Sequence, residues 1–218
     1  MVGAEERGLK RPRGDLSKAR AVWLASRGGL AALTLCVAAC AGSVFGPDAV
    51  PTFDLTAPRP AHTETAPRGQ LVVSEPSALS ILESDRIVVR SAGDQVAHLA
   101  NAQWSDRLPR LLQSRLVEAL ENAGRARPVG TPDDRFSADY QLVTELRAFE
   151  ISVISGPVAQ VEIAAKLVTE RGGKILASQV FHASVPARSS SGPDAVAALD
   201  EAFHQVATAL VQWAARFV

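Results

Sequence analysis

The sequence predicts an α+β domain in which a mainly antiparallel sheet carries two amphipathic helices on one face. Three observations support this: short apolar runs typical of strands, two longer segments with helical spacing, and the order strands, helix, strands, helix. The chain has 218 residues, which leaves room for one ordinary domain plus extensions. Hydrophobic residues make up 47% and charged residues 21% of the chain, so a packed core is expected.

The first half of the domain is expected to contain two short strands and one helix. The apolar runs Leu71–Val73 and Ile87–Val89 have the composition of strands. From Trp104 to Ala123, apolar residues recur at three- and four-residue spacing, which predicts an amphipathic helix. Asp106 is the expected N-cap of this helix, and Gly124 is the expected residue just beyond its end.

Two long strands and a hairpin follow. Alternating apolar residues run from Tyr140 to Val153, but their phase changes near Arg147 and Ala148, which predicts a β-bulge. Another strand is expected around Val161 to Leu167, and Gly172-Gly173 then marks a hairpin turn. The returning strand should place these apolar residues on one face: Ile175, Ala177, Phe181, Ala183 and Val185.

The last expected element is a helix with a continuous apolar seam. The seam steps alternately by three and four residues through Val196, Leu199, Phe203, Val206, Leu210, Trp213 and Phe217. Such a seam can form a coiled coil between chains. However, Ala198, Ala202 and Ala209 widen the apolar stripe, which favours packing on the sheet.

A basic leader precedes the domain. Residues 1–40 carry seven Lys or Arg against three acids, whereas the net charge of the whole chain is zero. The uncharged stretch after Arg27 has 12 residues. As a helix it would span about 18 Å, which is too short for the bilayer core of about 30 Å. This pattern is typical of a secretory signal peptide.

The end of the leader resembles a bacterial lipobox. Val37-Ala38-Ala39 places small residues directly before Cys40. In proteins with this signal, the leader is cleaved before the cysteine, here between Ala39 and Cys40. The cysteine thiol then receives a diacylglyceryl group, and a fatty acid such as palmitate acylates the new amino terminus. Two or three acyl chains are enough for stable anchoring. The alternative is a secreted chain in which Cys40 is incidental.

The expected organisation has three parts: a lipoprotein signal peptide over 1–39, a Pro-rich tether over 40–70 and the domain over 71–218. A flexible tether of that length would reach about 30 Å. Within it, Phe53-Asp54-Leu55 is an exception that could add a short edge strand.

The residues carry no enzyme signature. Arg188 stands where a Gly-x-Ser-x-Gly motif around Ser190 would need glycine, and no two histidines have metal-ligand spacing. The four histidines are His62, His98, His182 and His204. Both cysteines precede the domain, which excludes a thiol nucleophile, a disulfide or a Cys-based zinc site within it. The zero net charge argues against nucleic-acid binding. We therefore expect no catalytic residues, metal or cofactor.

Several segments resemble the ABC-type transport auxiliary lipoprotein family. The resemblance rests on Ala78–Arg90, Trp104–Gln113, the helix from Ala202 to Trp213 and the lipobox at Cys40. Phe53 stands where the family's first strand often has tyrosine. The resemblance implies a non-enzymatic accessory protein of a mammalian-cell-entry (MCE) type ABC transporter. Such transporters are associated with moving phospholipids or other hydrophobic compounds across the cell envelope.

The resemblance also implies partners and a location. The partners would be the MCE-type permease and the periplasmic MCE protein, with the lipid anchor holding the domain at the periplasmic face of the envelope. Ala41, where an inner-membrane retention signal often has aspartate, favours the outer membrane. Trp104 is a weak candidate for the partner contact, and a core position is the favoured alternative for it. A homo-oligomer remains open. The second hypothesis is a lipoprotein that scaffolds or activates an outer-membrane or cell-wall assembly machine, and the third is an uncatalogued hydrolase.

Overall fold

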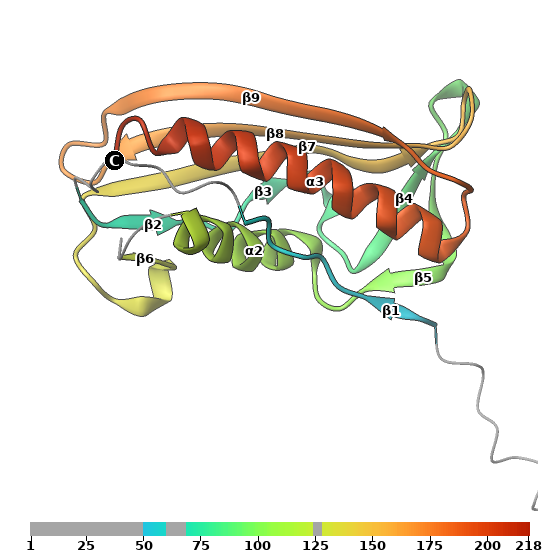
Figure 1. The fold of residues 1–218 in the computed structure, drawn as a ribbon, viewed down its shortest axis with the longest axis horizontal. Helices are drawn as coiled ribbons and strands as arrows, with labels where there is room; N and C mark the ends of the chain where they lie inside the picture. Colours follow the sequence, from blue (N-terminus) through green and yellow to red (C-terminus); the bar gives the residue numbers. More distant parts are fainter. Residues whose placement is uncertain (1–49, 60–68, 124–127) are drawn as a thin grey trace, which may run out of the picture. The chain divides into compact units, whose positions relative to one another are not determined.

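Strand β7 (Tyr140–Ser152) lies at the centre of a curved sheet (Figure 1). Along one edge it pairs antiparallel with β8 (Val158–Thr169), which in turn pairs antiparallel with β9 (Ile175–Pro186). The computed structural model describes residues 50–59, 69–123 and 128–218, and all of these belong to one unit, Val50–Val218. The expected signal peptide over 1–39, which ends at Ala39, and the expected lipidation site Cys40 lie outside the described residues.

The other edge of β7 pairs with three short strands in succession, all in parallel. They are β2 (Leu71–Val73), β3 (Ser77–Ala78) and β4 (Arg86–Arg90). The sheet is completed by β5 (Val96–Trp104), antiparallel to β4, and by two short parallel strands, β1 (Thr52–Phe53) beside β5 and β6 (Val129–Gly130) beside β2. The sheet is therefore mixed, and its antiparallel part consists of β7–β8–β9 and β4–β5.

Two helices cover one face of the sheet, as the sequence predicts (Figure 1). Helix α3 (Gly192–Ala214) packs on β8 and β9, and α2 (Leu108–Ala123) packs beside α3 and against β2 and β6. The connecting segments that the structure describes contain three short 3-10 helices: η2 (Ser80–Leu82), η3 (Ala92–Asp94) and η4 (Pro132–Asp134). Among the described residues, none of the helices combines the length and apolar character that crossing a membrane would require.

The apolar seam of α3 faces the sheet. Its six residues within the helix are buried, from Val196 at 8% exposed to Leu199, Phe203 and Leu210 at 0%. Phe203 is near Phe149 of β7 (6.4 Å between ring centroids), and Trp213 packs edge-on against Phe181 of β9 (5.7 Å). The seam therefore forms the core, and packing on the sheet is confirmed over the coiled-coil alternative.

The region before α2 differs from the expectation. Trp104 ends strand β5 instead of opening the helix, and α2 begins at Leu108. The Arg107 carbonyl accepts the first helical hydrogen bond, from the N–H of Leu111, so Asp106 is not the N-cap. Strand β5 is not predicted from the sequence because most of its residues are exposed, and an exposed strand shows no apolar alternation. Gly124 lies outside the described residues.

Both irregularities predicted in the long strands are confirmed. The β7–β8 register shifts between Leu146 and Ala148, which is the expected bulge. Gly172 and Gly173 both have positive φ, 86° and 62°, a conformation that favours glycine in a hairpin turn.

Ile175 is a correction to the expected apolar face of β9. It is 54% exposed, because a second register shift pairs Ala177 with Leu167 but Ile175 with Val168. Leu167 is buried beneath the helices, and its neighbour Val168 points to the opposite face of the sheet. The bulge thus turns Ile175 away from the core.

The buried seam of α3 generates a stability prediction. Replacing Phe203 or Trp213 with Ala should lower the free energy of unfolding by about 3 to 5 kcal/mol, a large part of the about 5 to 15 kcal/mol typical of a domain. Urea denaturation would measure the loss. Gln205→Ala, an exposed position on the same helix, is the control and should change stability by less than about 0.5 kcal/mol. Unchanged unfolding with an altered oligomeric state would instead indicate a seam between chains.

Candidate functional site

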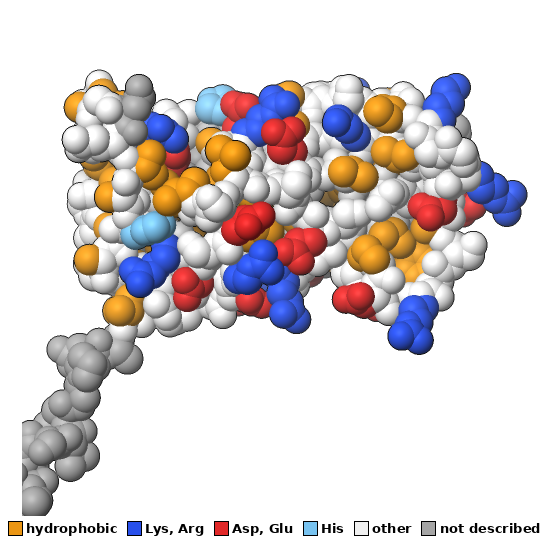
Figure 2. All heavy atoms as spheres, turned by 180° about the vertical axis from the view of Figure 1, so that it is seen from behind, with side chains coloured by type: hydrophobic (Ala, Val, Ile, Leu, Met, Phe, Trp, Pro, Cys, Tyr) orange, Lys and Arg blue, Asp and Glu red, His pale blue; other side chains and the backbone are white. Residues whose placement is uncertain are grey.

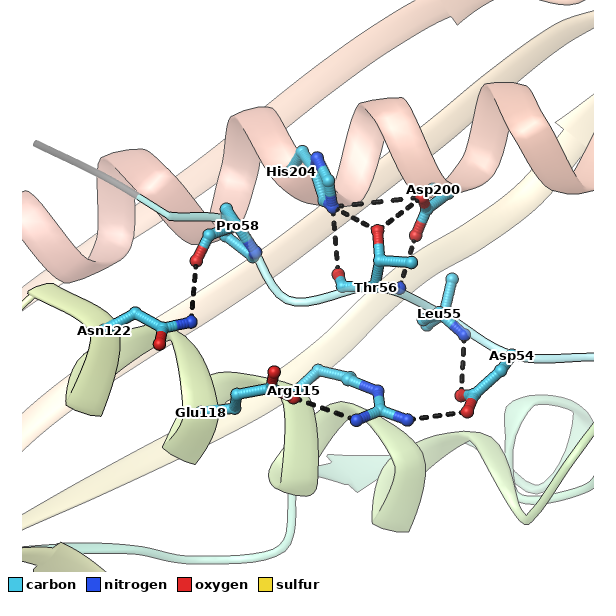
Figure 3. Close-up of polar contacts among 9 residues, drawn as sticks. All are labelled: Asp54, Leu55, Thr56, Pro58, Arg115, Glu118, Asn122, Asp200 and His204. Atoms are coloured by element: carbon cyan, nitrogen blue, oxygen red, sulfur yellow. Dashed lines mark hydrogen bonds and ion pairs between the residues drawn. The ribbon is translucent and has the colours of Figure 1, made fainter.

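The segment 50–59, called here the arm, is part of the folded unit and lies between α2 and α3 (Figures 1 and 3). It begins with β1, so the short edge strand considered at Phe53 does form. Leu55 is 1% exposed, and Pro58 is also buried. The folded unit therefore starts at Val50 and not at residue 71, which corrects the expected start of the domain. The remaining expected tether residues, 40–49 and 60–68, lie outside the described residues.

Helix α3 binds the arm at Thr56 (Figure 3). The backbone N–H of Thr56 donates to Oδ1 of Asp200 (2.7 Å), and its hydroxyl donates to Oδ2 of the same carboxylate (2.8 Å). One turn further along the helix, Nε2 of His204 lies 3.0 Å from the Thr56 carbonyl oxygen and 2.6 Å from Thr56 Oγ1. Because the Thr56 hydroxyl donates its proton to Asp200, both Thr56 oxygens can act only as acceptors toward His204. These contacts therefore favour the His204 tautomer with the proton on Nε2. Asp200 and His204 together form the α3 clamp.

Helix α2 binds the arm on its other side (Figure 3). Arg115 donates from Nη2 to Oδ2 of Asp54 (2.6 Å) and from Nη1 to Oε2 of Glu118 (2.9 Å). The other oxygen of Asp54 accepts the N–H of Leu55 (2.8 Å). Nδ2 of Asn122 lies 3.5 Å from the carbonyl oxygen of Pro58. The arm is thus joined to both helices by polar contacts on either side of its buried Leu55.

These contacts shift the ionisation of the ion pair. Partial burial alone would raise the pKa of Asp54, but the hydrogen bond and positive charge of Arg115, with the Leu55 N–H, hold this pKa below its usual value. Reciprocally, the hydrogen bond to Asp54 raises the pKa of Arg115, against the effect of burial. Both groups are therefore charged at neutral pH, and the ion pair is present there.

A cavity of about 830 Å³, open to solvent, lies beside these contacts. It is lined by the arm from Asp54 to Arg59 and by Arg115, Glu118, His204 and Thr208. Thr56, His204 and Asp200 are the residue types of a hydrolase triad. In a triad, however, one histidine nitrogen faces the nucleophile and the other faces the carboxylate. Here Nε2 faces both Thr56 and Asp200, the latter at 3.8 Å, and Asp200 binds the hydroxyl directly. This geometry fits a clamp on the arm.

Trp104, the candidate for a partner contact, lies in the core. It is 2% exposed and packs edge-on against Phe149, with 5.7 Å between the ring centroids. The partner-contact interpretation is wrong for Trp104, because a side chain enclosed by the core presents no surface to another protein. Among the described residues, no group of three or more His, Cys, Asp or Glu is placed to hold a metal ion.

Sequence reasoning missed the residues that join the arm to the helices. Asp200 and His204 are four residues apart and so share a face of α3, which is a signal visible in the sequence. Thr56, however, is 144 residues from Asp200 and lies in a segment without apolar periodicity. Only the folded chain brings them together.

The lowered pKa of Asp54 generates a pH prediction. The ionised Asp54 carboxylate contributes to the free energy of unfolding at any pH above its ordinary pKa of 3.8. This contribution is lost as the pH falls through the lower pKa of the folded state. At neutral pH, Asp54→Asn should lower the free energy of unfolding by less than about 1 kcal/mol, because the carboxylate is half exposed. The difference from the wild type should shrink in urea titrations at progressively lower pH. A difference independent of pH would contradict the ion-pair explanation.

The α3 clamp generates a second prediction. Asp200→Ala removes the acceptor of both Thr56 donors, so the arm should open more often, at a cost of about 1 kcal/mol. Hydrogen exchange measured by mass spectrometry should show faster exchange in residues 50–59. Glu201→Ala removes an exposed carboxylate from the same helical turn and should leave exchange in the arm unchanged. Equal exchange in both variants would show that Asp200 does not hold the arm.

Comparison with known proteins identifies the family. The model of the family described as ABC-type transport auxiliary lipoprotein component matches residues 53–211, from the arm to the last turns of α3. An uncharacterized protein of Bradyrhizobium diazoefficiens is 31% identical over 166 residues. That alignment covers 74% of this chain but only 44% of the relative, so the chain spans less than half the length of that protein.

Solved structures support the same conclusion. A crystal structure of a protein from Xanthomonas campestris is 30% identical, with a TM-score of 0.67, and the alignment covers 76% of this chain and 95% of that one. A crystal structure of an uncharacterized protein shares the fold at 14% identity, with a TM-score of 0.59 and coverage of 77% and 99%. Because the family model spans most of the folded unit, the chain belongs to the family of ABC-type transport auxiliary lipoprotein components.

Proposed function

We propose that this chain is a lipid-anchored accessory protein of an MCE-type ABC transport system for phospholipids or other hydrophobic substrates. Its domain would work at the periplasmic face of the envelope, anchored through Cys40 in the outer membrane. The observation that carries the proposal is the family match, which spans the folded unit from the arm to α3. The lipobox residues before Cys40 and the Ala41 that follows it support the anchor and its membrane.

The arm determines how far the domain can lie from its membrane. Because the folded unit starts at Val50, ten residue steps separate it from Cys40. Even fully extended, such a segment spans at most about 35 Å. The sequence predicts a tether of about 30 residues before the domain, whose fully extended length is much greater than that of the ten residue steps found here. The domain therefore stays near the membrane surface, which raises its effective concentration for a partner there.

The proposed action is binding without catalysis. Thr56, Asp200 and His204 have the residue types that catalysis would use, and their hydrogen bonds hold the arm. The ion pair of Asp54 and Arg115 serves the same segment. We infer that the domain contacts the permease or the periplasmic MCE protein of its transporter and requires no cofactor for doing so.

Co-purification tests the partnership. A tagged wild-type chain, recovered from detergent-solubilised envelopes, should bring down the permease and MCE proteins encoded beside it. A deletion strain should show impaired lipid transport, because the accessory protein would be missing. Recovery without these proteins, combined with intact lipid transport in the deletion strain, would contradict the proposal. Recovery with an outer-membrane or cell-wall assembly machine would favour the scaffold hypothesis instead.

The anchor is tested separately. Cys40→Ser removes the only thiol that the lipobox presents for acylation, so the variant should take up no labelled fatty acid and should leave the membrane fraction. Cys36→Ser lies four residues earlier in the leader and provides a matched control that should keep both label and membrane fractionation. If the wild type incorporates no label and Cys40→Ser still fractionates entirely with membranes, the lipid anchor is refuted.

A further inference from the structure

Strand β9 is a long edge strand. Its 12 residues pair with β8 on one side, and within the described part of the chain no strand pairs with its other side. In Figure 1 it forms the upper border of the sheet. From Ile175 to Pro186 it contains no Lys, Arg, Asp or Glu. A long edge strand without charge presents a row of backbone donors and acceptors that can template pairing with another strand.

The features that usually protect an edge are confined to the two ends of β9. A register shift at Leu176 marks a bulge at the start, and Pro186 ends the strand. Between them, Ala177–Val185 pairs with β8 in unbroken register. The regular part of the strand therefore carries neither a charge, a bulge nor a proline, which are the common devices against edge pairing.

Three large apolar side chains are exposed on β9. Ile175, Leu176 and Val180 are 54%, 38% and 48% exposed. The neighbouring strand β8 differs, because Lys166 is opposite Ser178 and Glu162 is opposite His182 on the same face. Seen from behind, that face of the molecule shows hydrophobic side chains interspersed with charged ones, without one continuous apolar patch (Figure 2). The edge, rather than the face of the sheet, is thus the distinctive surface.

We propose that β9 pairs antiparallel with β9 of a second copy of this chain, so that the two sheets join about a two-fold axis at Val180. This inference does not depend on the proposed transport function. A two-fold axis perpendicular to the sheet keeps the helix-free faces of both copies on the same side of the joined sheet. Residues that lie opposite each other on the two β9 strands must therefore have side chains on the same face. With the axis at Val180, each Val180 contacts the other, and each Ser178 is opposite His182 of the second copy.

The chemistry of the edge favours a second copy as its occupant. An identical uncharged strand brings no repulsion, the Val180 pair removes apolar surface from water, and Ser178 and His182 can form a hydrogen bond across the axis. Head-to-tail pairing would need a different free edge. Strands β1 and β6 have two residues each, and β1 pairs with the outer edge of β5 only at Gln103 and Trp104, so the part of β5 before Gln103 is the edge that head-to-tail pairing would use. Pairing of β9 with itself uses the same edge on both copies and gives a closed dimer, which disulfide trapping at Val180 distinguishes from the head-to-tail arrangement.

The oligomeric state tests this proposal. The full chain, with Cys36→Ser and Cys40→Ser to remove its thiols, should sediment as a dimer in analytical ultracentrifugation. Adding Val180→Lys places two like charges in contact at the axis and should raise the dissociation constant at least about tenfold. Leu79→Lys makes the same change at a 71% exposed residue outside β9 and should leave the dimer intact. Equal melting temperatures would show that both variants are folded.

Disulfide trapping tests the register. In the same cysteine-free chain, Val180→Cys should form a covalent dimer on mild oxidation, because the two thiols face each other across the axis. Ser184→Cys, an exposed position on the same strand and face, lies away from the axis and should not. A monomeric parent chain, a dimer unaffected by Val180→Lys, or equal trapping at both positions would overturn the proposal.

Discussion

The rest of the structure depends on the phase shift within β7. Alternation along a regular strand would place Leu146 and Phe149 on opposite faces, because they are three residues apart. The bulge at Arg147 restores both to the side covered by the helices, where each is 1% exposed. Phe149 then packs edge-on against Trp104 of β5 and lies near Phe203 of α3. One extra residue in one strand thus connects β5 and α3 to the centre of the sheet.

The two edges of β7 explain why the sheet is mixed. The hairpin at Gly172-Gly173 makes β8 and β9 antiparallel, since a tight turn can only return the chain alongside itself. The opposite edge is filled by β2, β3 and β4, which precede α2 and run in the same direction as β7. Strand β4 is further joined to β7 by the ion pair of Arg90 with the buried Glu150 (Nη2 to Oε2, 2.9 Å). A buried carboxylate of this kind requires its partner, so it favours this register of β4 over alternatives.

The arm connects the fold to the proposed function. It is short, and Leu55 and the contacts of Asp54 and Thr56 with α2 and α3 make it part of the domain. Since the family match starts at residue 53, the arm belongs to the family's fold as well as to this chain. Its attachment leaves only a short segment between the domain and Cys40. The same contacts occupy Thr56, Asp200 and His204, so these three side chains hold the arm in place.

The sequence by itself determined the elements whose signals are local. The apolar periods of α2 and α3, the phase change in β7, and the paired glycines of the hairpin each arise within one segment, and the structure confirms all of them. Tertiary structure alone decided the parallel pairing of β2, β3 and β4, the exposed strand β5, the core position of Trp104 and the attachment of the arm. Parallel pairing and the contact of Thr56 with Asp200 join segments far apart in the chain, so no local pattern encodes them. The arm shows the physical reason most clearly. The short strand β1, the buried Leu55 and Pro58 and a few polar contacts hold it, and their partners lie in distant segments of the chain, so no local pattern displays them.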